Sequence, residues 1–253
     1  MAQGTVMAHG GTTSLRQIGW VRPRHAREIV SSCWSVGAET MDRDYTIYRH
    51  WRSYLGPLGV KKARLQAGWA KTEKQRGVYD WAWLDEIIPD MVDQGVEPWV
   101  CLCYGNPLYG GTVHLGSPLP SADALVAWLA FVDAFVERYG HVVDEWEVWN
   151  EPNLGHATSP FSAGQGSANH STAFTYNSPQ AYTELFIATA ETIRRRQPHS
   201  TIMGFSLATI DLYFLDQGLA VLQERNKLDL LDQVTYHPYA VNPDVCYPKV
   251  DRL

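Results

Sequence analysis

The sequence has few of the features that mark secreted, metal-binding or membrane-spanning proteins. Its four cysteines show neither a disulfide framework nor paired C-x-x-C metal spacing. Cys101 and Cys103 lie two apart in a strand-like run, so we expect both to face one side as small buried residues. No apolar run approaches the length of a membrane span, and residues 1–14 show no signal peptide. These absences predict no membrane partner and a cytoplasmic location.

Runs of basic residues are also missing. The formal net charge is −6 at pH 7 and the pI is near 5.8, which argues against a nucleic-acid partner because phosphate backbones attract positive surfaces. A zinc site needs several converging His, Cys or acidic ligands. Because the histidines that follow the predicted elements are scattered over different loops, we expect no metal site and no cofactor. These histidines are His114, His156, His170 and His237.

The residues that the chain does have in quantity are aromatic. It contains ten tryptophans and thirteen tyrosines among 253 residues. Sugar-binding clefts use such rings as stacking platforms, although each ring taken alone is more often part of a core. Apolar residues make up 45% and charged residues 19% of the chain, which is ordinary for a globular protein. The length suits one large α/β domain or two small ones.

Strand-like and helix-like segments alternate along the chain. Such alternation predicts a parallel sheet with helices outside it. The helix that begins at Ser121 is the clearest, because Ser121 is a good N-cap and apolar residues follow at helical spacing. The predicted strands cover residues 29–37, 62–68, 97–104, 146–149, 201–206 and 233–237, and the predicted helices cover 44–58, 80–95, 121–140, 178–196 and 212–222.

The connections between these segments favour a barrel. A doubly wound sheet would have a Gly-rich phosphate loop after an early strand, and the sequence has none. Polar residues end nearly every strand, which is typical of a (β/α)8 TIM barrel. Six of the eight βα units are visible, so we expect an incomplete barrel domain over residues 31–253, truncated after the sixth strand. Residues 1–30 are interpreted as an N-terminal lead-in.

The fourth predicted strand ends in the motif Trp149-Asn150-Glu151-Pro152. The proline stops the strand and leaves an amide and a carboxylate side by side at its carboxyl end, where barrels carry their catalytic groups. A carboxylic acid in this position suits general acid/base work on a sugar, because one carboxyl group must protonate the leaving oxygen. The simpler alternative is an acidic residue that caps whatever follows the strand.

From about residue 30 to residue 243 the chain resembles a clan A glycoside hydrolase of the family 39 β-xylosidase type. The Trp-Asn-Glu-Pro motif carries most of the resemblance, and Arg64 on the second strand supports it. Further support comes from the segment 77–85 (Gly-Val-Tyr-Asp-Trp, then Leu-Asp) and from His237-Pro238-Tyr239 on the sixth strand. The resemblance implies a (β/α)8 barrel and retaining hydrolysis of a β-glycosidic bond in an oligosaccharide or other glycoside.

The resemblance also implies roles for individual residues. Glu151 would be the general acid/base, and Asn150 would bind the sugar 2-hydroxyl. Arg64 would lie on the barrel floor and hold the nucleophile, which the family carries on a seventh strand beyond this chain. Gln66 stands where close relatives often have a histidine. His237 and Tyr239 would line the wall of the sugar site, and Trp69 and Asn106, just past strand ends, are further substrate-binding candidates.

Other residues near the ends of predicted strands have structural roles as the favoured explanation. For the acids Glu39, Asp42, Glu73 and Asp244, loop solvation or helix capping is favoured over catalysis. Packing is favoured for Tyr104 and Tyr109, and solvation for His156.

The leading hypothesis is therefore an O-glycosyl hydrolase domain with Glu151 as acid/base. Two alternatives stay open: a non-catalytic carbohydrate-binding protein that has lost the nucleophile, and an inactive fragment that does not fold.

Overall fold

The computed structural model of the protein describes residues 24–111, 113, 119, 121–154, 178–239 and 242–251. Most of the predicted lead-in lies outside these residues. So do residues 155–177 and three of the histidines considered as metal ligands: His114, His156 and His170.

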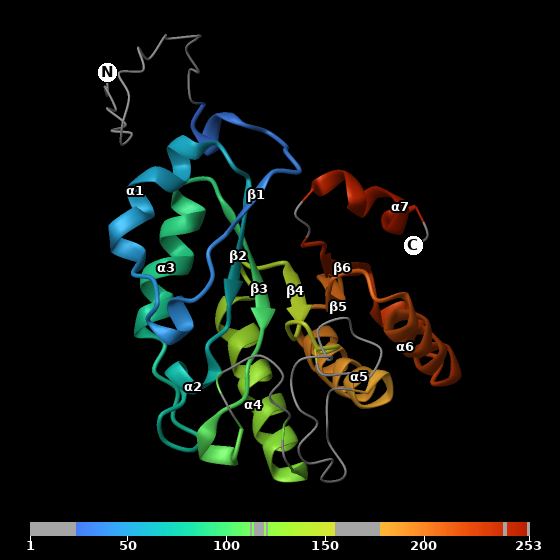
Figure 1. Ribbon diagram of the computed structural model, residues 1–253. Helices are drawn as coiled ribbons and strands as arrows, with labels where there is room; N and C mark the ends of the chain where they lie inside the picture. The colour runs from blue at the N-terminus through green and yellow to red at the C-terminus, as the bar shows by residue number, and fades with distance from the viewer. Residues whose placement is uncertain are drawn as a thin grey trace, which may run out of the picture.

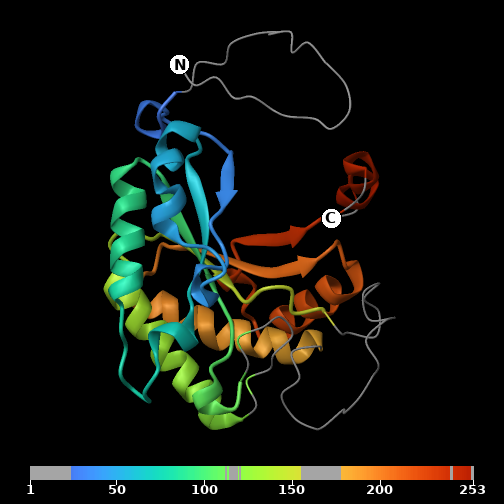
Figure 2. The same cartoon turned by 60° about the vertical axis from the view of Figure 1, so that its left-hand side comes forward.

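The described chain is built on one parallel sheet whose strands follow one another in sequence order. Every strand pairs with its sequence neighbour, for example Arg64 of β2 with Trp99 of β3. Figure 2 shows the sheet curled, with helices on its outer face and β1 and β6 at its two edges. This half-barrel confirms the predicted fold class. The strands are β1 (Ser35–Gly37), β2 (Lys62–Gln66), β3 (Glu97–Leu102), β4 (Glu145–Val148), β5 (Thr201–Ala208) and β6 (Gln233–His237).

The helices begin and end largely where the sequence signals predict (Figure 1). Ser121 and Ser178 each cap a helix, because their side chains accept hydrogen bonds from Ala124 N and Ala181 N. Gly59 ends the first long helix with a φ of 77°, which glycine adopts at little cost. The helices are α1 (Tyr48–Leu58), α2 (Trp69–Thr72), α3 (Ala82–Asp93), α4 (Ala122–Tyr139), α5 (Pro179–Arg196), α6 (Leu212–Glu224) and α7 (Tyr247–Val250).

The first βα unit differs most from the prediction. Only Ser35–Gly37 of the strand expected over 29–37 pairs with β2, and a short 3-10 turn at Ala26–Glu28 precedes it. The helix expected from residue 44 begins at Tyr48, because Asp44 adopts a left-handed φ of 59° that ends a preceding turn. An edge strand has a partner on one side only, so fewer of its residues are drawn into regular pairing.

The core lies between the sheet and the outer helices and is rich in aromatic rings. Trp69, Trp128 and Phe131 are fully buried there with Trp146 and Trp149. Their rings contact one another, for example Trp128 with Trp149 at a centroid distance of 5.6 Å. Many of the aromatic residues therefore serve packing, which the sequence could not separate from sugar stacking.

The concave side of the sheet is open. Among the described residues, β1 pairs only with β2, and β6 pairs only with β5. Strands β2 and β5 are almost wholly buried, whereas every residue of β1 and β6 retains some exposure. A closed (β/α)8 barrel has eight strands and no edges, and the described residues supply six of them, with β1 and β6 as edges. In the described part of the chain, no helix is long and apolar enough to cross a membrane.

Candidate active site

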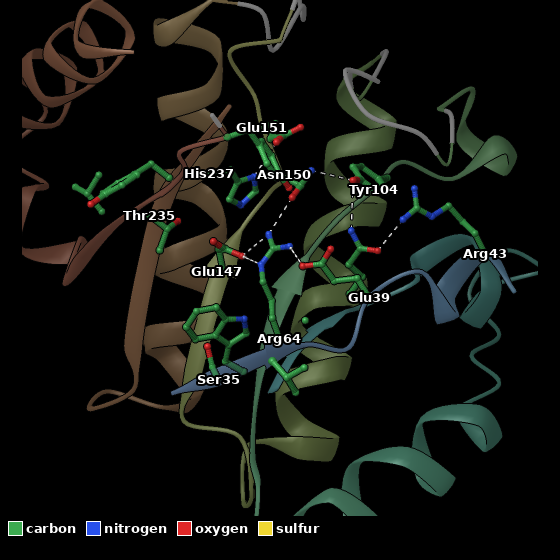
Figure 3. A pocket seen from close by; sticks show the side chains of 17 residues that line it. Ser35, Glu39, Arg43, Arg64, Tyr104, Glu147, Asn150, Glu151, Thr235 and His237 are labelled. Carbon is green, nitrogen blue, oxygen red and sulfur yellow. Dashed lines mark hydrogen bonds and ion pairs between the residues drawn. The ribbon is translucent and has the colours of Figure 1, made fainter. Parts of the chain in front are cut away.

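A cavity of about 500 Å³ lies on the concave side of the sheet. Its walls come from residues along β1 to β4 and β6 and from the segments that follow these strands, where barrel enzymes carry their catalytic groups. Figure 3 shows that charged side chains from separate strands meet in it. The lining residues are Ser35, Val36, Gly37, Glu39, Arg43, Arg64, Gln66, Trp99, Tyr104, Glu147, Asn150, Glu151, Val234, Thr235, Tyr236, His237 and Tyr239.

Glu151 follows β4 in an unusual backbone conformation. Trp149 and Glu151 have φ angles of 70° and 50°, which non-glycine residues seldom adopt and which concentrate at functional sites. The Glu151 N–H donates to Ser206 O at 2.8 Å. This bond fixes the turn after the strand, so the Glu151 carboxyl group lines the cavity with only 8% of the residue exposed.

Ser206 reaches the site because β5 is irregular at this point. The pairing of β5 with β6 shifts between Gly204 and Leu207, and Ser206 itself has a φ of 37°. Bulges of this kind redirect side chains and are common beside active sites. The Ser206 hydroxyl lies 3.3 Å from both Arg64 Nη2 and His237 Nε2. Nothing in the sequence pattern pointed to this residue.

His237 is paired with Glu151. Its Nδ1 atom lies 2.7 Å from Glu151 Oε1, which is hydrogen-bond distance. Tyr239 follows on the rim, three-quarters exposed, with its ring centroid 6.1 Å from that of His237. Partial burial raises the pKa of the Tyr239 hydroxyl, and the nearby Glu151 and Glu39 charges add to the shift. His237 and Tyr239, which were predicted to line the wall of the sugar site, therefore both lie at the cavity.

Arg64 lies buried at the floor and connects three side chains. Its Nε donates to Glu147 Oε2 at 2.6 Å, its Nη1 to Glu39 Oε1 at 2.7 Å, and its Nη2 to Asn150 Oδ1 at 2.9 Å. Burial alone would lower the pKa of the guanidinium, but neighbours that include Cys101, Glu147 and Glu39 outweigh it and hold that pKa above its ordinary value. Arg64 is therefore a fixed cation that holds the side chains of Glu147, Glu39 and Asn150 in place.

A second chain of hydrogen bonds crosses the wall opposite His237. Asn150 Nδ2 donates to the Tyr104 hydroxyl at 2.9 Å, and Gln66 Nε2 reaches the same hydroxyl at 3.4 Å. Gln66 Oε1 accepts from Arg43 Nη2 at 2.8 Å. The Arg43 guanidinium also lies 5.1 Å from the centre of the Tyr104 ring. Both ends of the Asn150 and Gln66 amides are thus engaged, which fixes how they face a ligand.

Glu39, Arg43 and Tyr104 were missed as site residues by the sequence reasoning. Tyr104 was assigned to packing and Glu39 to loop solvation, yet both line the cavity. The available signal was position alone: each follows β1 or β3 by a few residues. Arg43 reaches the cavity from the turn after β1.

Trp69 and Asn106 were predicted to contact substrate, but neither lines the cavity. Both are buried beside Glu73. Trp69 Nε1 donates to Glu73 Oε2 at 2.5 Å, and Asn106 Nδ2 donates to the Glu73 carbonyl at 2.9 Å. The Tyr109 ring stacks on Trp69 at a centroid distance of 5.3 Å. These residues lie past strand ends as predicted, but they face the outer helices, because a strand end alone does not fix which way a side chain turns.

The remaining acids have other surroundings. Loop solvation and helix capping are the two roles expected of Glu73; the residue is 1% exposed, so it is not solvated, and it is the C-cap residue of α2. Asp42 pairs with Arg43, and burial raises the pKa of its carboxyl group. Glu145 forms a partly buried ion pair with Lys62. Asp244 is exposed. Among the described residues, no group of three or more His, Cys, Asp and Glu side chains could hold a metal ion.

The sequence matches no family model and no curated protein, but the structure is similar to solved glycoside hydrolases. A monomeric β-xylosidase from Caulobacter crescentus CB15 matches with a TM-score of 0.62 and 24% identity over 86% of this chain and 47% of that one. A family 39 enzyme from Xanthomonas axonopodis pv. citri matches with a TM-score of 0.61 and 24% identity over 86% and 46%. A psychrophilic family 10 endo-β-1,4-xylanase matches at 0.53 and 15% over 80% and 62%.

These similarities show the fold of the chain and how much of each solved structure the chain covers. This chain spans about half the length of the two family 39 structures. The chain has a (β/α)8-barrel fold, of which the described residues form six strands in their sequence order.

Proposed function

We propose that the chain belongs to a retaining glycoside hydrolase that cleaves β-linked O-glycosides, with Glu151 as general acid/base. The observation that carries this proposal is the Glu151 carboxyl group at the end of β4, paired with His237 inside a polar cavity. A general acid must lie within hydrogen-bond reach of the leaving oxygen and must be able to exchange its proton. Glu151 Oε1 contacts His237, and its Oε2 accepts no hydrogen bond from the described residues.

The groups around Glu151 suit a sugar. Arg64 and Tyr104 hold the Asn150 amide from both sides, so its remaining N–H has a fixed direction for a sugar hydroxyl. The cavity lining carries both signs of charge. Its cations are Arg43 and Arg64, and its carboxylates are Glu39, Glu147 and Glu151. Such a lining favours a neutral ligand with many hydroxyl groups over a strongly charged one. A volume of about 500 Å³ lies within the usual range for small-molecule sites.

The solved structures with this fold guide the choice of substrate. A β-xylosidase and an endo-β-1,4-xylanase are among the structures with this fold. We take β-xylosides as the first substrates to test. The carbohydrate-binding alternative uses the same cavity and predicts binding without turnover.

Retention needs a second carboxyl group about 5–5.5 Å from the acid/base. The other carboxylates in the cavity, Glu39 and Glu147, are both engaged by Arg64. We assign the nucleophile to a further strand that fills the gap between β1 and β6. The buried Trp99 indole N–H supports this, because it lines the cavity and finds no acceptor among the described residues although buried donors are normally paired.

The test compares Glu151→Gln with the unchanged sequence on two β-xylosides, each in a protein that also contains the strand proposed to carry the nucleophile. On xylobiose, whose leaving sugar needs a proton, kcat/KM should fall roughly hundred- to ten-thousand-fold. On dinitrophenyl β-xyloside, whose leaving group needs no proton, kcat/KM should fall much less. Glu145→Gln, which removes a carboxylate outside the cavity, is the matched control and should change neither value.

Equal losses on both substrates would contradict the acid role of Glu151. Tight xylobiose binding with no turnover by either protein would favour the non-catalytic alternative.

A further inference from the structure

We infer that Glu39 determines sugar specificity by accepting a hydroxyl hydrogen bond from the bound glycone, an inference that rests on the proposed function. Glu39 lies just after β1, and it is in place before any ligand arrives. The preceding Ala38 N–H donates to Arg64 O at 2.8 Å, and the following Thr40 N–H donates to Gln66 Oε1 at 3.1 Å. The backbone on both sides of Glu39 is thus tied to β2.

One oxygen of Glu39 is anchored and the other is open to the cavity. Oε1 accepts from Arg64 Nη1 at 2.7 Å, while Oε2 accepts no hydrogen bond from the described residues. The Glu39 side chain is 38% exposed, whereas the side chain of Glu147, which pairs with the same guanidinium, is 1% exposed. Arg64 therefore has one buried carboxylate that neutralises it and one carboxylate that still faces solvent.

Arg64 also places Glu39 beside the predicted sugar position. Its Nη1 holds Glu39 and its Nη2 holds Asn150, and Figure 3 shows the two side chains converging on this guanidinium. Asn150 is the residue that we expect at the sugar 2-hydroxyl. The free oxygen of Glu39 is thus held next to the same sugar ring, where it can accept from a hydroxyl that Asn150 does not take.

The charges in the cavity select a hydroxyl group as the partner of Glu39. Glu39 already has a cation as its partner, because Arg64 Nη1 lies 2.7 Å from its Oε1. Its charge is therefore balanced, and a neutral hydroxyl donor can fill the remaining acceptor position without adding a charge to the cavity. Hydrogen bonds to a charged acceptor are also the stronger kind, so loss of this bond should be measurable.

The experiment measures binding, so that turnover is not required. Calorimetry gives the affinity of methyl 1-thio-β-xyloside, which resists hydrolysis, and of its 2-, 3- and 4-deoxy analogues, for the unchanged protein and for Glu39→Gln. The substitution should weaken binding of the parent sugar by roughly ten- to hundredfold, the effect of one hydrogen bond to a charged group. One deoxy analogue should bind both proteins with the same affinity, because it lacks the hydroxyl group that donates a hydrogen bond to Glu39.

Two controls protect the interpretation. Glu145→Gln, away from the cavity, should leave every affinity unchanged. If a thermal melt shows that Glu39→Gln does not fold, Glu39→Asp takes its place, because it retains the charge on a shorter side chain. It should weaken binding of the parent sugar and leave the affinity for the same deoxy analogue unchanged.

The outcomes separate the inference from the proposed function. If the unchanged protein binds none of the sugars, both are overturned. If it binds them and Glu39→Gln binds them equally well, the inference alone is overturned. It is also overturned if the substitution weakens all three deoxy analogues by the same factor, because Glu39 would then only position Arg64.

Discussion

Two regions of this protein each bury a glutamate beside aromatic residues just beyond a strand end, yet their surroundings differ. Glu73, in the region behind β2 and β3, accepts hydrogen bonds from Trp69 Nε1, Gly77 N and the Tyr109 hydroxyl. Glu151, in the cavity, contacts His237 through one oxygen. Both residues are under 10% exposed. Burial therefore does not separate the two regions, but the number of filled acceptor positions does.

This difference teaches how a structural carboxylate is told from a candidate catalytic one. Protein donors fill both oxygens of Glu73, so it has little capacity left for a ligand. Glu151 and Glu39 each leave an oxygen facing the cavity, where a ligand can complete the set. A carboxylate whose acceptor positions are satisfied stabilises the fold, whereas one that is left incomplete is available for chemistry or binding.

The largest effect on stability is expected from removing the packing that supports Glu73. Trp128 is fully buried, contacts the Trp69 ring at 5.6 Å and donates to Thr189 Oγ1 at 3.0 Å. Trp128→Ala should lower the free energy of unfolding by about 3–5 kcal/mol. Urea unfolding measures this change. Tyr239→Ala, at the exposed rim of the cavity, should cost less than about 0.5 kcal/mol, and equal costs would contradict the contrast between the regions.

A smaller effect is expected when the Glu73 carboxylate itself is changed. In Glu73→Gln an amide NH2 replaces one acceptor oxygen, so at least one of the three buried donors loses its partner. This should cost about 1–3 kcal/mol of unfolding free energy. Glu151→Gln is the matched change in the other region and should cost less than about 1 kcal/mol, because its second oxygen has no donor to lose among the described residues. Chemical denaturation of both variants decides the matter, and the reverse order would refute the distinction.

The smallest effect is expected from a carboxylate with filled acceptor positions that lies at the surface. Asp85 accepts from Arg138 and from the Tyr139 hydroxyl, and these bonds lower the pKa of its carboxyl group. Since the side chain is 40% exposed, solvent screens the pair, and Asp85→Asn should cost only about 0.2–1 kcal/mol at neutral pH.

The pH dependence of this cost has a definite sign. The folded state favours the ionised form of Asp85, so its contribution is present above the unfolded pKa of about 3.9 and is lost as the pH falls through the lowered folded value. The difference in melting temperature between Asp85→Asn and the unchanged protein should therefore shrink in acid. A difference that grows in acid would show that the ion pair is not its source.

Much of the fold could be predicted from local patterns. The helix caps at Ser121 and Ser178, the glycine after α1 and the span of β6 are all where the sequence places them. These features depend on near neighbours in the chain, so spacing alone defines them. The first strand was predicted too long, because its length depends on pairing partners that no local pattern reports.

The candidate site could be predicted only in part. Glu151, Asn150, Arg64, Gln66, His237 and Tyr239 meet at one cavity, because the carboxyl ends of parallel strands come together whatever the loops do. Trp69 and Asn106 do not reach it.

The amino-acid sequence by itself determined the alternation of strands and helices and the strand that carries Glu151, since both follow from periodicity and from residues adjacent in the chain. Only the tertiary structure decided that Glu39 faces the cavity while Glu73 faces the core. It also decided that the shift in β5 brings Ser206 against His237. The physical reason is that a side chain's direction and its hydrogen-bond partners are set by contacts between segments far apart in the chain.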